Sequence, residues 1–221
     1  FPLAPSCERY TGTDFSSAAL DYVARHLPQE LEADGRVRLL ARHADDFSAI
    51  PGGEHDLVIL NSVVQYFPSA EYLHRVLTGA VRSVARGAVF IGDVRSLALL
   101  ETFAFSVELA NAEDDDSLTD LRERVARRLL LEQELAVAPE FFHALRAELP
   151  QIRAVEVLPK RGHHVTELTS FRYDVILHVG PASGGPESPS LRLTWSSDTP
   201  TPDAHRRRLV RAGEADEDVA D

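Results

Sequence analysis

The sequence contains no methionine and only one cysteine. Because it begins with Phe1 and has no methionine, it shows no translation start, and we expect it to be an excerpt of a longer protein. The single cysteine, Cys7, cannot form an internal disulfide bond, which is typical of a protein of the reducing cytoplasm. Cys7 lies beside Glu8, and we interpret it as an inert side chain rather than as a catalytic thiol.

Long apolar runs and net positive charge are also lacking. No apolar run approaches the roughly 18 residues that a membrane-spanning helix needs, and no signal-peptide pattern opens the sequence. The net charge of -12 argues against a surface for duplex DNA, because such a surface needs basic side chains that displace counterions. We therefore expect a cytoplasmic protein with no nucleic-acid and no membrane partner, in which a few local groups still suffice to bind a small ligand.

The first half of the sequence alternates between strand-like and helical segments. Apolar residues recur with a helical period after Ser16 or Ser17 and again over residues 69–85, where Ser69 is the expected cap. Alternation at this spacing indicates parallel βαβ units in an open α/β sheet. The expected strands are residues 8–14, 37–41, 56–60 and 88–91.

The second half has a different pattern. Residues 97–149 are helical in character and are expected to form three helices, one of them capped by Asp116 or Ser117. Residues 152–158 and 171–179 are expected to be two late strands. After Gly180 the composition becomes rich in Pro, Gly and Ser and then highly charged. We expect one domain over residues 1–180 and a linker with a charged, disordered tail over residues 181–221.

Polar residues gather where the expected parallel strands end, which is where ligands bind in open α/β sheets. Asp14 suits a ribose diol or, equally, a helix cap. Asp45 or Asp46 suits an adenine amino group, with Phe47 as an apolar face, but an ordinary exposed loop explains them too. Asn61 and Ser62 either line a reaction centre or satisfy backbone groups at a strand end. Asp93 and Arg95 either pair with each other or orient a substrate, and a structural ion pair is the better explanation of Arg95.

Other catalytic motifs are missing. The sequence has no nucleophile elbow, no phosphate-binding Walker loop, no His-Glu-x-x-His helix and no Cys/His cluster. His163 and His164 form the only histidine pair, and either is a candidate general base. Adjacent histidines in a loop are more often simply exposed, and no third ligand for a metal lies nearby.

Several longer motifs resemble a known family. NSVVQYFPSAEYL (61–73), FIGDVRS (90–96), ELAVAPEFF (134–142) and KRGHHVTELTSFRYDVIL (160–177) are similar to the methyltransferase domains embedded in nonribosomal peptide synthetases. LAPSCERYTGTDFSSAAL (3–20) and ADDFS (44–48) fit as well, so the resemblance extends over about residues 3–180. It implies a class I, Rossmann-like fold with a helical insertion and antiparallel late strands, and S-adenosylmethionine as cofactor. The implied substrate is an aminoacyl group tethered to a carrier domain and methylated on nitrogen, with adenylation and carrier domains as neighbours.

The resemblance also implies roles for individual residues. Asp14 is placed at the ribose hydroxyls and Asp45 or Asp46 at the adenine. Asn61, Ser62, Gln65 and Tyr66 are placed near the transferred methyl group. Glu167 and the two histidines are candidate bases by residue type, since an α-ammonium group must lose a proton before it attacks. Asp93, Arg95, Glu167 and Arg172 match motif positions of the family without an individual role.

The sequence departs from the family in one respect. The family's first strand and Gly-rich loop, which hold the methionine part of the cofactor, are expected to precede residue 1. That strand normally lies between the strands that end at Asp14 and Asn61, so its removal is expected to leave two strand edges unpaired. Two alternatives remain open: a freestanding N-, O- or C-methyltransferase, and an inactive structural module of an assembly line. A nicotinamide-dependent oxidoreductase fits the motifs less well.

Overall fold

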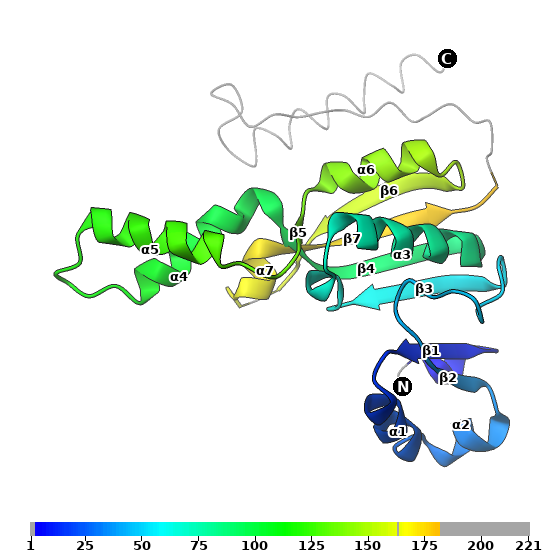
Figure 1. The fold of residues 1–221 in the computed structure, drawn as a ribbon. Coiled ribbons are helices and arrows are strands. Elements are labelled where there is room, and N and C mark those ends of the chain that lie inside the picture. The colour runs from blue at the N-terminus through cyan, green and yellow to red at the C-terminus, as the bar shows by residue number, and fades with distance from the viewer. Residues whose placement is uncertain (1–2, 163, 182–221) are drawn as a thin grey trace, which may run out of the picture. The chain divides into compact units, whose positions relative to one another are not determined.

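The computed structural model describes residues 3–162 and 164–181 (Figure 1). His163 and nearly all of the expected linker and tail lie outside these residues. The first sheet has two parallel strands, β1 (Tyr10–Asp14) and β2 (Val37–Ala41). Between them lie α1 (Ser17–Arg25) and the short α2 (Gln29–Asp34), and a 3-10 turn (Ala4–Ser6) precedes them. Ser16 is the N-cap of α1, as the sequence predicts, because its side chain accepts a hydrogen bond from the amide of Ala19.

The second sheet has five strands in the order β3-β4-β7-β6, with the two-residue β5 paired to β4. Strand β3 runs parallel to β4, whereas β7 is antiparallel to both β4 and β6. This arrangement confirms the expected parallel βαβ unit and the antiparallel late strands. The strands are β3 (His55–Asn61), β4 (Val84–Ser96), β5 (Ala136–Val137), β6 (Ile152–Pro159) and β7 (Arg172–Val179).

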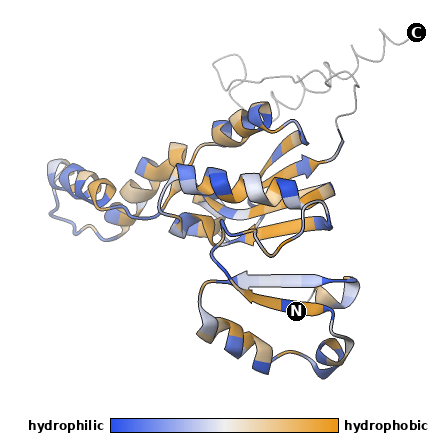
Figure 2. Ribbon diagram, turned by 45° about the vertical axis from the view of Figure 1, so that its right-hand side comes forward, coloured by the Kyte–Doolittle hydropathy of each residue, from blue (hydrophilic) through white to orange (hydrophobic). Residues whose placement is uncertain are grey.

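The core lies between this second sheet and the helices α3 (Ala70–Ser83) and α6 (Pro139–Glu148). Ser69 caps α3, as predicted, and the helix buries Leu73, Leu77 and Ala80 on one face. Alternate residues of β4 and β7 face these side chains, because successive residues of a strand point to opposite faces. Figure 2 shows the hydrophobic residues concentrated in the strands of this sheet, while α3 alternates polar and apolar residues around its axis.

Three α-helices occupy residues 97–149, in agreement with the prediction, and Ser117 is the cap of the second. They are α4 (Leu100–Ala110), preceded by a 3-10 turn (Leu97–Leu99), α5 (Leu118–Leu130) and α6 (Pro139–Glu148). Helices α4 and α5 pack on each other, and Ala104, Leu121 and Val125 are their buried residues. A further short helix, α7 (Glu167–Phe171), was not predicted, since five residues are too few to show a helical period.

The strands β1 and β3 are not hydrogen-bonded to each other, and within residues 3–162 and 164–181 each has a partner on one side only. The expected pair of open edges is therefore present. One face of β3 is uncovered as well: Leu57 and Ile59 are 48% and 43% exposed, whereas Val58 and Leu60 pack on the core. Apolar side chains at such a position normally lie beneath another layer of the fold.

Candidate active site

The strands β3 and β4 end side by side, and each ends in an unusual backbone conformation. Asn61 is in register with Gly92, and the amide of Ser62 donates to the carbonyl of Gly92 at 3.1 Å. Ser62 and Asp93 have φ angles of 57° and 63°, and they are the non-glycine residues with positive φ in the described part of the chain. This left-handed conformation costs about 1–2 kcal/mol per residue. Such strain clusters at functional sites, where surrounding contacts hold it in place.

Side chains connect the two strained residues. The Asn61 amide Nδ2 donates to Ser62 Oγ at 3.1 Å, and Ser62 Oγ in turn donates to the Asp93 carboxylate in a short hydrogen bond. Gly92 leaves the room that this arrangement needs, because a Cβ there would lie 2.0 Å from Asn61 Oδ1. The side chain of Asn61 thus lies directly across the glycine of the neighbouring strand.

A lysine completes the cluster. Lys160, which follows β6, places Nζ 2.5 Å from Asp93 Oδ1 and 2.7 Å from Asp174 Oδ1. The amide of Asp93 donates to Asp174 Oδ1 at 2.9 Å, at a point where the β4–β7 register shifts. Burial alone would raise the pKa of the Asp93 carboxyl, but hydrogen bonds from Lys160 and Ser62 lower it below its usual range. Asp93 is therefore held ionised.

Lys160 and Asp174 were not among the site residues predicted from the sequence. One signal was available: the 23 basic residues of the sequence comprise 22 arginines and this one lysine. A guanidinium is planar and presents its donors in a fork, whereas an ammonium is a compact charge that two carboxylates can approach at a single atom. Lysine at this position is therefore chemically distinct from the arginines elsewhere. Asp174 shows no comparable signal, because it alternates with buried residues as any polar strand residue does.

The 3-10 turn Val64–Tyr66 follows Ser62 directly. Gln65 is only 3% exposed; its Nε2 donates to the Ser62 carbonyl at 3.1 Å, and its backbone carbonyl accepts from Leu135. Because the Ser62 carbonyl can only accept, its contact with the Gln65 side chain fixes which end of that amide is nitrogen. Its Oε1 is buried without a partner among the described residues. Tyr66 is 71% exposed.

Asp14 ends β1 and contributes to the start of α1. Its Oδ1 accepts a hydrogen bond from the amide of Ser16 at 2.7 Å. Together with Gly12 and apolar residues of α1 it also lines a cavity of about 400 Å³. A carboxylate has several acceptor positions, so the helix-start contact and a ligand contact are compatible in one side chain.

The acidic pair after β2 lies in two different environments. Asp46 forms an ion pair with Arg42 at 2.9 Å, and hydrogen bonds from Ser48 lower the pKa of its carboxyl. Asp45 lies 3.4 Å from Arg75 of α3 and lines a cavity of about 480 Å³ together with Phe47. The Phe47 ring packs against Gly79, where an added Cβ would lie 2.2 Å from it.

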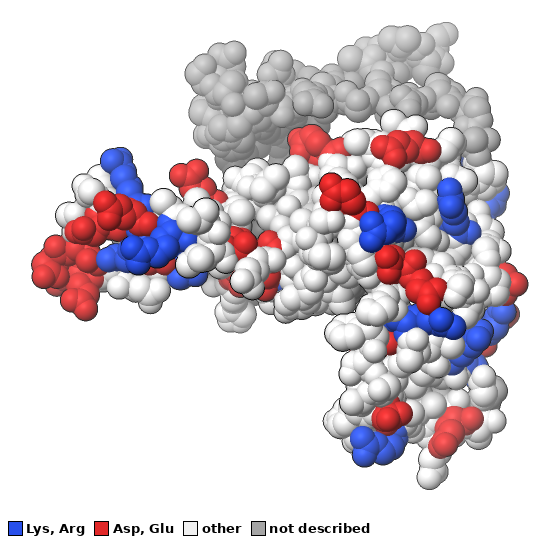
Figure 3. Space-filling view, viewed as in Figure 1, with Lys and Arg blue, Asp and Glu red and all other residues white. Residues whose placement is uncertain are grey.

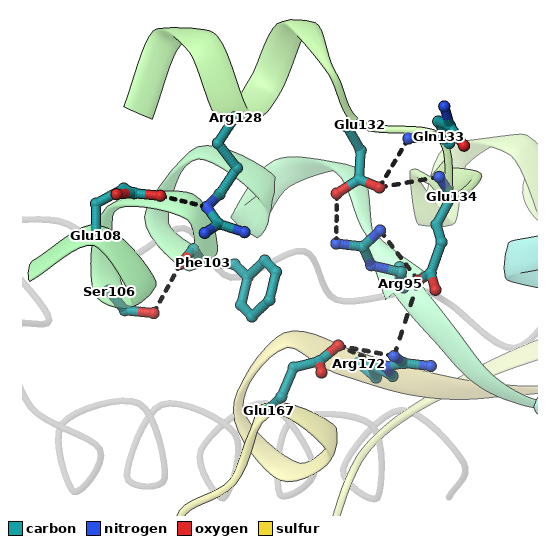
Figure 4. A network of polar contacts seen from close by, with 10 residues as sticks. All are labelled: Arg95, Phe103, Ser106, Glu108, Arg128, Glu132, Gln133, Glu134, Glu167 and Arg172. Atoms are coloured by element: carbon teal, nitrogen blue, oxygen red, sulfur yellow. Dashed lines mark hydrogen bonds and ion pairs between the residues drawn. The ribbon is translucent and has the colours of Figure 1, made fainter. Parts of the chain in front are cut away.

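Glu167 and Arg172 belong to a network of ion pairs shown in Figure 4. Arg172 bonds Oε1 of Glu167 at 2.7 and 3.1 Å. Arg95, whose side chain is 6% exposed, pairs with Glu132 at 2.9 Å and with Glu134 at 3.2 Å. The alternative that Asp93 pairs with Arg95 is therefore wrong, and the structural ion pair expected for Arg95 is confirmed. Its partners come from a loop far along the chain, which sequence spacing does not reveal.

Other kinds of site find no support in the described residues. No group of three His, Cys, Asp or Glu side chains there could hold a metal ion. None of the helices in the described part of the chain combines the length and the hydrophobicity of a membrane span. His164 is exposed. On the face shown in Figure 3, basic side chains are interspersed with acidic ones and form no continuous basic surface.

The residues at the strand ends suit S-adenosylmethionine. Acidic side chains follow β1 and β2, where hydrogen-bond acceptors can bind ribose hydroxyls and an adenine amino group. A polar, strained turn follows β3. The first segment of the chain, residues 1–92, matches the methyltransferase-domain family.

Solved structures agree on the fold. N-methyltransferase NodS from Bradyrhizobium japonicum WM9, solved with S-adenosyl-L-homocysteine, aligns with a TM-score of 0.51 at 16% identity, covering 80% of this chain and 70% of that one. Magnesium protoporphyrin IX methyltransferase (ChlM) from Synechocystis PCC 6803, also with bound S-adenosylhomocysteine, gives a TM-score of 0.51 at 15% identity, covering 81% and 67%. The fold and the family match together define a class I S-adenosylmethionine-dependent methyltransferase.

Within that class, the chain is homologous to segments of nonribosomal peptide synthetases and related synthases. It is 45% identical over 194 residues to chondramide synthase CmdD of Chondromyces crocatus, covering 87% of this chain and 5% of the synthase. It is 39% identical over 203 residues to the probable non-canonical nonribosomal peptide synthetase CymA of Salinispora arenicola (90% and 2%), and 37% identical over 174 residues to cyclosporin synthetase SimA of Tolypocladium inflatum (78% and 1%). The chain thus spans no more than about a twentieth of these relatives.

Proposed function

We propose that this domain transfers the methyl group of S-adenosylmethionine to the amino group of an aminoacyl substrate tethered to a carrier domain, next to adenylation and carrier domains of one synthetase. The observation that carries the proposal is the hydrogen-bonded cluster of Asn61, Ser62 and Asp93 at the ends of β3 and β4, in a chain homologous to segments of such synthetases. Bound S-adenosylmethionine supplies an electrophilic methyl group on its sulfonium. The protein must then align the acceptor nitrogen and remove its proton.

The proposed residue roles follow the strand ends. Asp14 binds the ribose hydroxyls, Asp45 or Asp46 binds the adenine, and Phe47 contributes an apolar face. Asn61 and Ser62 contact the reacting end of the cofactor. Gln65, Tyr66 and Glu167 are assigned to the substrate side of the site.

Glu167 is the proposed acceptor of the ammonium proton. Both of its hydrogen bonds with Arg172 use Oε1. Arg172 therefore orients the carboxylate through Oε1 and leaves Oε2 free of its hydrogen bonds, so that Oε2 can accept a proton. The Glu167 side chain is 39% exposed, which allows a tethered substrate to reach it.

The open edges of β1 and β3, with the uncovered Leu57 and Ile59, suggest a further strand with its Gly-rich loop and a covering helix. We propose that a segment upstream of residue 1 supplies them, and that residues 181–221 are a linker and a charged tail. Calorimetry tests this proposal. We expect the chain extended upstream to bind S-adenosylmethionine at least about 100-fold more tightly than the 221-residue chain, a difference of about 2.7 kcal/mol. Equal affinities would contradict the proposal.

The substrate is tested with the extended protein and carrier domains loaded with different amino acids. We expect mass spectrometry to show a gain of one methyl group on the aminoacyl nitrogen of the tethered substrate, and much slower methylation of the same free amino acid. Methylation of the free amino acid alone would favour a freestanding small-molecule enzyme. Absence of S-adenosylmethionine binding in the extended protein would favour an inactive structural module.

Asp14 offers a separate test of the cofactor site. In Asp14→Asn the amide oxygen can still accept from the Ser16 amide, so α1 should keep its start. A ribose hydroxyl loses a charged acceptor. We therefore expect the affinity of the upstream-extended protein for S-adenosylmethionine to fall about tenfold, since hydrogen bonds to charged groups contribute about 1.5–3 kcal/mol. The matched control is Asp21→Asn at an exposed position of α1, which should bind S-adenosylmethionine as the wild type does. Unchanged affinity in Asp14→Asn would remove Asp14 from the site.

A further inference from the structure

We propose that Lys160 is a positioning residue for methyl transfer: it holds the strained Ser62–Asp93 pair in place and, through it, the side chain of Asn61. This inference rests on the proposed function, because it assigns a role in the same site. It concerns a residue that touches neither Asn61 nor Ser62 in the structure; its contacts are the carboxylates of Asp93 and Asp174.

A path of hydrogen bonds connects Lys160 to Asn61. Lys160 Nζ contacts Asp93 Oδ1, the other oxygen of that carboxylate accepts from Ser62 Oγ, and Ser62 Oγ accepts from Asn61 Nδ2. Each contact is a hydrogen bond with a defined donor. The orientation of the Asn61 amide is therefore set by a chain of three bonds that begins at the ammonium.

The backbone at Asp93 depends on the same Lys160 ammonium. Asp174 Oδ1 accepts from both Lys160 Nζ and the amide of Asp93, which lies where the ladder between β4 and β7 shifts register. Without a cation, the carboxylates of Asp93 and Asp174 would lie close together and repel each other. Asp93 would then lose the contacts that keep it in the left-handed conformation.

The three charged side chains of this cluster are mostly buried. Lys160, Asp93 and Asp174 are only 19%, 14% and 18% exposed. Charges shielded in this way interact more strongly than exposed ones, so the cluster is more than a surface ion pair. The compact ammonium also fits between two carboxylate oxygens at 2.5 and 2.7 Å, a geometry that a planar guanidinium does not reproduce.

The test uses the upstream-extended protein with a carrier-tethered aminoacyl substrate. We expect Lys160→Met to lower kcat about 10- to 100-fold, because a small misplacement of an aligning group costs that much, while affinity for S-adenosylmethionine changes little. Lys160→Arg keeps the charge and is expected to be impaired as well, since shape and not charge alone is required. In Lys160→Ala, added ethylammonium is expected to restore part of kcat. The matched control is Arg161→Met at the exposed neighbouring position, with kcat within about twofold of the wild type.

A purely structural role would give a different pattern. If kcat of Lys160→Met is recovered when the assay temperature is lowered until mutant and wild type are equally folded, Lys160 only stabilises the fold and the inference is overturned. An unchanged kcat in Lys160→Met, or full activity of Lys160→Arg, also overturns it. These outcomes are distinct from failure of the proposed function, in which the wild-type protein itself transfers no methyl group.

Discussion

Replacing Arg95 by methionine is expected to lower the free energy of unfolding by about 3 kcal/mol. Arg95 is 6% exposed and is the common partner of Glu132 and Glu134 (Figure 4). Its removal leaves two partly buried carboxylates without their cation, and Arg172 is a poor substitute at 4.0 Å from Glu134. The loss is measured by urea unfolding of the mutant and wild-type proteins at pH 7.

Two comparisons make the Arg95 prediction specific. Arg86→Met, at an exposed position of the same strand, should change stability by less than about 0.5 kcal/mol. Adding Glu132→Leu to Arg95→Met should recover part of the loss, because the unpaired carboxylate is then removed. If Arg95→Met is no more destabilising than Arg86→Met, the network of Figure 4 does not stabilise the fold.

The stability contributed by the Arg95–Glu132 pair depends on pH in a defined way. The hydrogen bond from Arg95 lowers the pKa of the Glu132 carboxyl below its usual 4.5, outweighing burial, which would raise it. A carboxyl whose pKa is lower in the folded state contributes stability above its unfolded pKa, and this contribution is lost as the pH falls through the folded value. The difference in stability between wild type and Arg95→Met should therefore be constant at neutral pH and narrow below pH 4.5. A difference that widened in acid would contradict this assignment.

Replacing Gly92 by alanine is expected to reduce kcat/KM for methyl transfer about 100-fold with little loss of stability. The added Cβ would lie 2.0 Å from Asn61 Oδ1 and 2.8 Å from Phe90 Cε1. Because the end of the exposed Asn61 side chain can rotate away, the fold loses little. The same rotation removes Asn61 from the position in which we propose it contacts the reacting end of the cofactor. Steady-state kinetics of the extended protein, alongside thermal unfolding, measure both effects.

The control for Gly92→Ala is Gly180→Ala, where an added Cβ would lie 3.2 Å from Cδ of the flexible Arg153 side chain, far along the chain from the proposed site residues. This variant should keep full activity. If Gly92→Ala acts through Asn61, then adding Asn61→Ala to it should cause no further loss, since both changes remove the same interaction. A fully active Gly92→Ala enzyme, or additive losses in the double mutant, would remove Asn61 from the reaction centre.

The sequence by itself determined the local elements of this protein. Ser16, Ser69 and Ser117 mark helix starts because a hydroxyl accepts from the amide two or three residues later, a contact that depends only on neighbours in the chain. The apolar period over residues 69–85 predicted helix α3 for the same reason. The motifs around Asn61 and Gly92 were enough to indicate a methyltransferase, and the comparisons confirmed that class.

Only the tertiary structure decided which charged groups meet. Arg95 pairs with glutamates from the loop before β5 instead of with Asp93, and Asp93 pairs with Lys160 from beyond β6. The pairing of β7 between β4 and β6 brings Lys160 to Asp93, and the pairing of β5 with β4 brings the glutamates to Arg95. Sequence spacing encodes neither pairing. The strain at Ser62 and Asp93 was equally invisible, because a positive φ in a residue other than glycine is imposed by surrounding contacts and not by the residue itself.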